Sequence, residues 1–159
     1  MSSKQATDLW LVQIDADGTP REDLGGLPET AASVCAQTAA LYRMAGFTPP
    51  WVGYLALQGS QLVGTCAFTG APQEGRVEIA YFTFPEFEGQ GVATSMARAL
   101  IEIVDGSGAQ VLVFAHTLPE VNASNSILKK LGFTFAGTVP HSEEGSVWEW
   151  HRAALENLI

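Results

Sequence analysis

The residues best suited to hold an anion form a short turn between a strand-like segment and an apolar helical segment. The turn spans residues 88–94, Glu-Gly-Gln-Gly-Val-Ala-Thr, with small residues at Gly89, Gly91 and Ala93. Small residues let backbone N–H groups converge on one point where a helix begins, and the helix dipole adds to their field. Because the dipole alone contributes only about 0.3–1 kcal/mol, direct N–H contacts must provide the rest. The pattern predicts a phosphate site.

Three classes of phosphate site use such a turn, and the flanking residues separate them. A nucleoside-triphosphate loop needs Lys and then Ser or Thr straight after its second glycine, but Val92 and Ala93 follow Gly91. A dinucleotide fingerprint needs a small residue in place of Thr94 and a carboxylate after a second strand, and residues 111–116 contain none. A turn for the pyrophosphate of coenzyme A needs only spaced small residues before a helix. We therefore expect coenzyme A.

Two longer blocks resemble one family. Residues 77–94, Val-Glu-Ile-Ala-Tyr-Phe-Thr-Phe followed by Pro-Glu-Phe-Glu-Gly-Gln-Gly-Val-Ala-Thr, resemble the acetyl-CoA motif of the GNAT N-acetyltransferase superfamily. Residues 118–133, Leu-Pro-Glu-Val-Asn-Ala-Ser-Asn-Ser-Ile-Leu-Lys-Lys-Leu-Gly-Phe, resemble its second motif, in a form similar to the ribosomal-protein (Rim-like) branch. The resemblance covers residues from about 51 to 152 and is specific because both motifs occur in the right order.

The resemblance implies a mixed α/β, GNAT-like fold: a central twisted, mostly antiparallel sheet with a splayed parallel strand pair, flanked by helices. It also implies an N-acetyltransferase that moves acetyl from acetyl-CoA to a primary amine of a small molecule or a protein N-terminus. The alternative is a catalytically weak or inactive acyl-CoA-binding regulatory module. The sequence does not identify the amine. Homodimers are common in the superfamily, and the sequence leaves the oligomeric state open.

Cofactor contacts are carried over from the family to the matching positions. In GNAT enzymes the motif strand offers backbone amides to the pantetheine arm or to the acetyl carbonyl, the turn binds the pyrophosphate, and a polar residue of the second motif satisfies a pantetheine amide. The side chains of Phe82 and Phe84 themselves are expected in the core. The cofactor-binding positions are Phe82, Thr83, Phe84, Gly89, Gln90, Gly91, Val92, Ala93, Thr94, Asn122 and Asn125.

Two residues are the catalytic candidates. Glu78 lies on the motif strand, where GNAT enzymes often place a carboxylate that takes the amine proton. Strand alternation puts it on one face with Ala80 and Phe82, and apolar neighbours would raise its pKa and make it a better base. A glutamate at a solvated strand end is the alternative. The resemblance makes Ser124 a donor to the sulfur, while helix capping is the alternative for Ser124 and for both asparagines.

Two positions depart from the family pattern. Glu88 stands where Arg or Gln is usual, and a carboxylate beside a pyrophosphate weakens binding unless it points into water. Leu128 stands where many members carry the Tyr that protonates the thiolate. These departures keep the binding-only alternative open. His116, after an apolar strand, is a further proton acceptor to consider, or a hydrogen-bonded structural histidine.

Hydrophobic periodicity predicts alternating element types. Residues 29–45 are predicted as an alanine-rich helix ended by Gly46, and apolar residues at three- and four-residue spacing from Val92 to Val104 predict a buried helix face. A short helix is predicted at 122–131. The predicted strands are 9–14, 52–57, 61–69, 76–84, 111–115, 133–139 and 146–151.

Length and composition limit the number of domains and the classes of partner that the chain can have. The chain has 159 residues, enough for one core, so residues 1–159 are expected to form a single acetyltransferase domain. A net charge of −9 disfavours nucleic acid and favours a cationic amine, although plain solubility explains the charge equally well. We expect no membrane span, no secretion signal and no metal site, and two cysteines are too few for a disulfide framework. The expected location is the cytoplasm.

Overall fold

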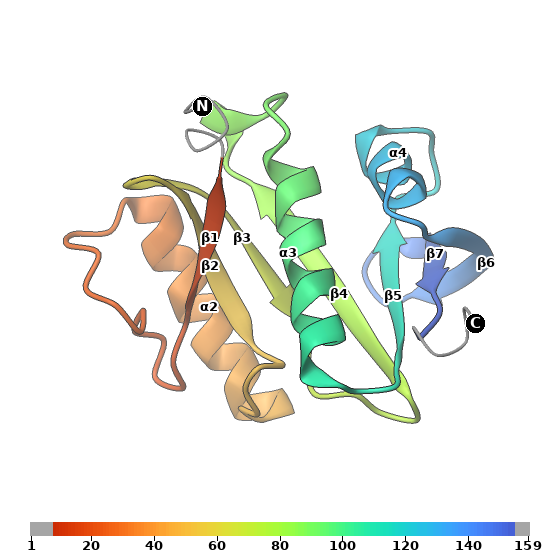
Figure 1. The fold of residues 1–159 in the computed structure, drawn as a ribbon, viewed down its shortest axis with the longest axis horizontal. Coiled ribbons are helices and arrows are strands. Elements are labelled where there is room, and N and C mark those ends of the chain that lie inside the picture. The colour runs from red at the N-terminus through yellow and green to blue at the C-terminus, as the bar shows by residue number, and fades with distance from the viewer. Residues whose placement is uncertain (1–7, 155–159) are drawn as a thin grey trace.

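The computed structural model describes residues 8–154 and contains one seven-stranded sheet with helices on both faces (Figure 1). The helix predicted at residues 29–45 is confirmed as α2 (Glu29–Ala45). The other helical segments are η1 (Pro85–Phe87), α3 (Val92–Ser107) and α4 (Ala123–Lys130). The strands are β1 (Leu9–Gln13), β2 (Gly53–Gln58), β3 (Gln61–Phe68), β4 (Arg76–Thr83), β5 (Leu112–Thr117), β6 (Thr134–His141) and β7 (Gly145–Arg152).

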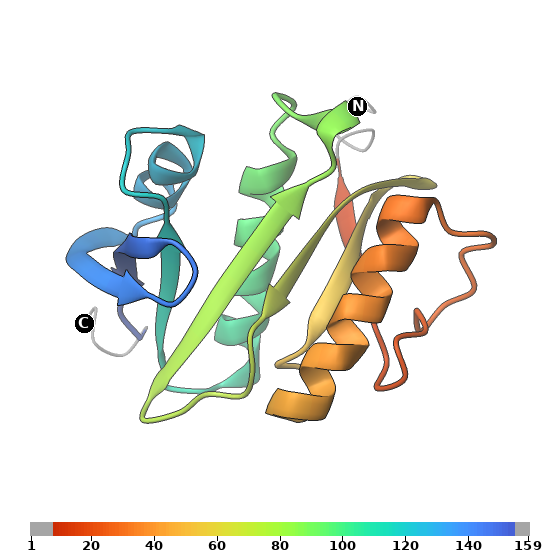
Figure 2. The same ribbon diagram turned by 180° about the vertical axis from the view of Figure 1, so that it is seen from behind.

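The strand order is β1-β2-β3-β4-β5-β7-β6, and every neighbouring pair is antiparallel except β4–β5. This confirms the predicted fold class. The parallel pair is short, because the two strands pair only from Arg76–Leu112 to Glu78–Phe114. Beyond that point β4 and β5 separate, and the opening between them widens toward η1 and α4 (Figures 1 and 2). The sheet is therefore split by a gap at its centre.

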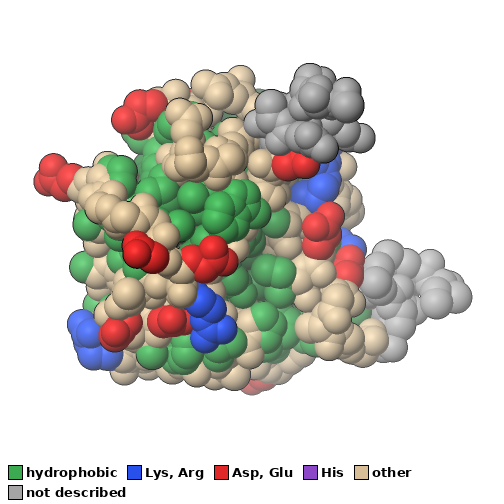
Figure 3. Space-filling model, turned by 60° about the vertical axis from the view of Figure 1, so that its left-hand side comes forward, with side chains coloured by type: hydrophobic (Ala, Val, Ile, Leu, Met, Phe, Trp, Pro, Cys, Tyr) green, Lys and Arg blue, Asp and Glu red, His purple; other side chains and the backbone are tan. Residues whose placement is uncertain are grey.

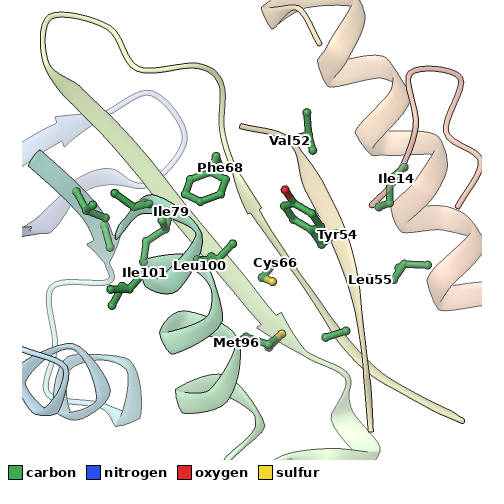
Figure 4. Packing of buried hydrophobic residues seen from close by; sticks show 14 of the residues in the cluster. Ile14, Val52, Tyr54, Leu55, Cys66, Phe68, Ile79, Met96, Leu100 and Ile101 are labelled. Atoms are coloured by element: carbon green, nitrogen blue, oxygen red, sulfur yellow. The ribbon is translucent and has the colours of Figure 1, made fainter. Parts of the chain in front are cut away.

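Alternation along β4 decides which side chains face which helix. Val77 and Ile79 are buried against the core that α3 covers, together with Met96 and Leu100 of that helix (Figure 4). Glu78, Ala80 and Phe82 point to the opposite face. On that face α2 covers β1 to β3 and leaves β4 and β5 uncovered (Figure 2). Polar side chains on this uncovered part of the sheet can contact solvent.

Gly64 on β3 lets the sheet and α3 approach closely. A Cβ atom there would lie 2.6 Å from the carbonyl oxygen of Phe82 and 3.1 Å from the Met96 side chain. Only glycine fits such a contact without a shift of the neighbouring backbone. The close approach packs α3 directly on the face of β3 and β4, and β4 forms one edge of the central gap.

Both cysteines are free and buried, and burial raises the pKa of the Cys35 and Cys66 thiols. A protonated buried thiol is inert, so neither serves as a nucleophile. None of the helices between residues 8 and 154 has the length and apolarity that a membrane span requires. Within the same residues, no three His, Cys, Asp or Glu side chains are grouped to hold a metal ion.

Candidate active site

The turn before α3 has the backbone shape that the sequence predicted for an anion site. Gly89 and Gly91 have φ angles of 79° and 83°, in the left-handed region that favours glycine. The first helical hydrogen bond runs from the Ser95 N–H to the Gly91 carbonyl, and no side chain caps the helix. The amides of residues 90–94 accordingly find no acceptor among the described residues. Glu88 is exposed beside them.

Backbone hydrogen bonding along β4 determines which amides face the central gap. The Phe84 N–H donates to the Val63 carbonyl, and the Thr69 N–H donates to the Glu78 carbonyl, both across the β3–β4 ladder. Because ladder direction alternates along a strand, the even-numbered amides of β4 point to β3 and the odd-numbered ones point to the gap. The gap therefore receives the amides of Tyr81 and Thr83.

This geometry changes part of the expected cofactor set. The Phe84 amide is already bonded to β3 and is not free for a cofactor, and alternation assigns the Phe82 amide to β3 as well. The Phe84 side chain is buried as expected, but the Phe82 side chain is 50% exposed, so its expected place in the core is wrong. The sequence missed Tyr81, whose amide faces the gap. Tyr81 is an odd-numbered residue of a half-buried strand, and this position is the sequence signal that could have identified it.

Glu78 lies among polar groups rather than apolar ones. Its carboxylate accepts a hydrogen bond from the Thr69 hydroxyl at 3.2 Å, and its second oxygen lies 3.4 Å from His116 Nδ1. The side chain is 26% exposed. The expected apolar setting is therefore wrong, because His116, distant in sequence, reaches the same face from β5. The structure brings these two proton-acceptor candidates together at the start of the gap.

Glu149 on β7 links His116 to the rest of a charged cluster. His116 Nε2 lies 2.9 Å from one Glu149 oxygen, while His151 Nε2 and an Arg76 guanidinium nitrogen contact the other at 2.6 and 2.8 Å. Burial acts to raise the pKa of Glu149, but the hydrogen bonds from His151 and His116 and the charge of Arg76 outweigh it and hold that pKa below its ordinary value. Glu149 stays ionised and fixes the orientation of the His116 ring.

The start of α4 divides into structural and free polar groups. Asn122 caps the helix by accepting the Asn125 N–H at 3.2 Å. Asn125 is buried, with its oxygen accepting from Thr117 at 2.7 Å and its NH₂ donating to the Glu120 carbonyl. The capping alternative thus describes Asn122, and internal hydrogen bonds occupy the amide of Asn125. Ser124 is not the cap and remains partly exposed.

Leu128 and the Tyr81 hydroxyl are both buried at or near α4, where a proton donor for the leaving thiolate would be needed. Leu128 is fully buried in the core, so no group at that position faces a ligand. The Tyr81 hydroxyl is buried and forms no hydrogen bond of normal geometry with any residue from 8 to 154. Burial raises the pKa of Tyr81 to about 12, with the neighbouring Ser124 hydroxyl opposing that shift. Buried hydroxyls in proteins are almost always hydrogen-bonded, so this one is unusual.

A cavity of about 660 Å³ is lined by α2 and by the parts of β3 and β4 that face it. Glu29 is the one charged residue of its lining among the described residues; the rest includes Ser33, Gln37, Ala80 and Phe82. Glu78 is two residues before Ala80 and lies on the same face of β4. It lines a second hollow of about 570 Å³. Glu78 therefore faces the second hollow, while Ala80 and Phe82 on the same strand face the α2 cavity. Acidic side chains also surround the hydrophobic centre of the face drawn in Figure 3.

Residues 9–134 match the family model described as an acetyltransferase (GNAT) domain. The chain belongs to this family. As a GNAT member it is an acetyltransferase that uses acetyl-CoA, which confirms the predicted enzyme class and acetyl donor. No curated protein sequence matches the chain.

Solved GNAT structures share the fold at low sequence identity. A RimL ribosomal L7/L12 α-N-protein acetyltransferase with coenzyme A is 18% identical over 93% of this chain and 95% of its own, with a TM-score of 0.67. The microcin C7 self-immunity acetyltransferase MccE with acetyl-CoA and AMP is 16% identical over 78% and 70%, with a TM-score of 0.63. The aminoglycoside acetyltransferase AAC(6')-Ib with ribostamycin and coenzyme A is 18% identical over 64% and 63%, with a TM-score of 0.56. The first of these confirms the predicted likeness to the Rim-like branch.

Proposed function

We propose that this protein transfers acetyl from acetyl-CoA to a primary amine of a small molecule or a protein N-terminus. One observation carries the proposal: Glu78 and His116 lie 3.4 Å apart where β4 and β5 separate. A thioester placed in the gap would meet a proton acceptor on one side. The amides of residues 90–94, which find no acceptor among the described residues, lie at the wide end of the same gap and would hold the pyrophosphate.

The energetics of amine attack define what the site must supply. A lysine-like amine with a pKa of about 10.4 costs roughly 4.6 kcal/mol to deprotonate at pH 7. Positioning two reactants supplies up to about 7–11 kcal/mol, which exceeds that cost. The carboxyl groups of Glu78 and Glu149, of which Glu149 is the one that contacts Arg76, further favour a cation near the gap. The site therefore needs no covalent nucleophile, in agreement with two inert cysteines.

Each residue has a defined part in the proposed reaction. The amine enters from the α2 side, Glu78 takes its proton directly or through water, and the neutral nitrogen attacks the thioester carbon. The Thr83 amide donates to the carbonyl oxygen as it gains charge, and Ser124 contacts the sulfur. His116, held by Glu149, stabilises the negative charge of Glu78. It then carries the proton that Glu78 has taken from the amine away from the reaction centre.

The acceptor class rests on the α2 cavity. Its lining is largely uncharged, with hydroxyl and amide groups from α2, so it suits a polar amine of modest size or a peptide terminus. RimL is named for a protein α-amine and AAC(6')-Ib for an aminoglycoside, and both kinds of acceptor are compatible with this opening.

Thiol release from acetyl-CoA tests the proposal. Purified protein is incubated with acetyl-CoA and a panel of polyamines, aminoglycosides, amino acid amides and short peptides with free N-termini, and products are identified by mass spectrometry. We expect amine-dependent release and an acetylated amine of one class. Tight acetyl-CoA binding with no release above the amine-free rate, across the panel, would contradict the proposal and favour a binding-only module.

A further inference from the structure

Tyr81 combines three properties that the other tyrosines of the described chain do not share. Its hydroxyl is buried without a hydrogen-bond partner of normal geometry, whereas Tyr42 donates to the Ile14 carbonyl at 2.7 Å and Tyr54 to the Pro50 carbonyl at 2.6 Å. Its amide faces the central gap. The Ser124 hydroxyl lies near enough to oppose the rise in the pKa of Tyr81.

The proximity of Ser124 locates the Tyr81 hydroxyl. Tyr81 belongs to β4, while Ser124 belongs to α4, which follows β5. The two strands no longer pair at this level, since pairing ends at Glu78 and Phe114. A side chain that extends from β4 to α4 must therefore cross the gap. The phenolic oxygen lies on the α3 and α4 side of the sheet, opposite the carboxylate of Glu78, because their positions alternate along the strand.

We propose that Tyr81 donates a hydrogen bond to the sulfur atom of coenzyme A as the thioester breaks. The inference rests on the proposed acetyl transfer and supplies its missing donor on the leaving-group side. An unpartnered buried donor is costly in the free protein and becomes satisfied only when an acceptor enters. A sulfur that gains negative charge is a better acceptor than the neutral thioester, so the hydrogen bond strengthens toward the transition state.

The step balances without any further reagent. The amine nitrogen forms the C–N bond, the C–S bond breaks, and its electron pair remains on sulfur. Burial holds the pKa of Tyr81 at about 12, above the value of about 8.5 for an ordinary thiol, so the proton stays on the phenolic oxygen. The thiolate leaves held by this hydrogen bond and takes a proton from water when coenzyme A dissociates. The amine proton leaves through Glu78 on the opposite face.

Tyr81→Phe tests the proposal, with Tyr54→Phe as a matched control. Both phenols are buried, and burial raises the pKa of each to about 12. We expect Tyr81→Phe to lower kcat about 10- to 100-fold, as for a lost hydrogen bond to a charged group, with little change in the KM for acetyl-CoA. Its melting temperature should stay level or rise, because the variant removes an unsatisfied hydroxyl. Tyr54→Phe should show the reverse, a lower melting temperature with unchanged kcat.

Titration of bound coenzyme A by thiolate absorbance gives a readout that needs no acceptor amine. Wild type should lower the pKa of the bound thiol, and Tyr81→Phe should raise that pKa by about one unit relative to wild type for a tenfold effect. Equal thiol pKa values in the two proteins overturn the inference, as does loss of kcat in Ser124→Ala but not in Tyr81→Phe. If coenzyme A does not bind wild type at all, the proposed acetyl transfer is contradicted as well. Binding to wild type therefore distinguishes a failure of the Tyr81 inference from a failure of the proposed function.

Discussion

The Glu78 carboxylate on β4 lies 3.4 Å from His116 Nδ1 on β5; Glu78 belongs to the last pair of the two strands, and His116 lies two residues beyond its partner Phe114. Two consequences follow from this arrangement. The parallel pair is held together up to the base of the gap, and the carboxylate is kept at its entrance rather than in the core. Glu149 completes the arrangement by holding the far nitrogen of the His116 ring at 2.9 Å.

Gly91→Ala should weaken acetyl-CoA binding by about tenfold, because a side chain disfavours the left-handed backbone that aims the turn amides. No atom lies within 4 Å of a Cβ at this position, so strain alone acts. Titration calorimetry with acetyl-CoA measures the change. Gly59→Ala, at a hairpin turn with φ of 61° and equally open surroundings, is the control and should bind acetyl-CoA as wild type does. Equal weakening in both variants would contradict a specific role for the turn.

Glu149→Gln should reduce the loss of stability on acidification. The folded pKa of Glu149 lies below its ordinary value of 4.5, so its contribution is full above about that pH and is lost as pH falls through the folded pKa. Urea unfolding at neutral pH and at about pH 3 gives the two free energies of unfolding. Wild type should lose more between them than the variant. Glu143→Gln, at an exposed position outside the cluster, should lose as much as wild type.

Leu128→Tyr should destabilise the protein by about 1–3 kcal/mol through overpacking, although it restores the residue common in the family. Leu128 is fully buried, so a phenol there cannot reach the gap without displacing core side chains. Denaturant unfolding measures the loss, and kcat should not rise. Leu128→Met conserves volume and should cost less than about 1.5 kcal/mol. A gain of activity in the Tyr variant would show that α4 presents this position to the cofactor.

Glu29→Lys should raise the KM for a cationic acceptor about tenfold, because it reverses the charge at the one charged position lining the α2 cavity among the described residues. The KM for acetyl-CoA should change little. Glu102→Lys makes the same change in net charge at an exposed position on α3 and serves as the control. If both variants raise the acceptor KM equally, the overall charge rather than the cavity attracts the amine.

The sequence predicted the elements well where local signals were strong. The bounds of α2 follow from an alanine-rich stretch ended by Gly46, and the turn before α3 follows from Gly89 and Gly91. The class of fold followed from two motifs in a fixed order. These features depend on a few neighbouring residues, so a sequence reading reaches them.

The site was harder to predict because it depends on contacts between distant segments. The polar setting of Glu78 comes from His116, and through it from Glu149, on strands that the topology brings alongside. The hydrogen-bond direction at Phe84 depends on the register of β3 and β4, which no local pattern gives. The local sequence does not by itself place Tyr81 at the gap, because its relation to the gap depends on where the β4–β5 pairing ends.

The pH dependence of acetyl transfer in Glu78→Gln tests the central claim most directly. Initial rates of thiol release are measured with saturating acetyl-CoA and the preferred amine, beside Glu102→Gln as an exposed carboxylate control. We expect Glu78→Gln to lower kcat/KM by about 100-fold or more near neutral pH, with part of the rate regained as rising pH deprotonates the amine in solution. Turnover that stays close to wild type over the whole pH range would contradict proton removal at Glu78.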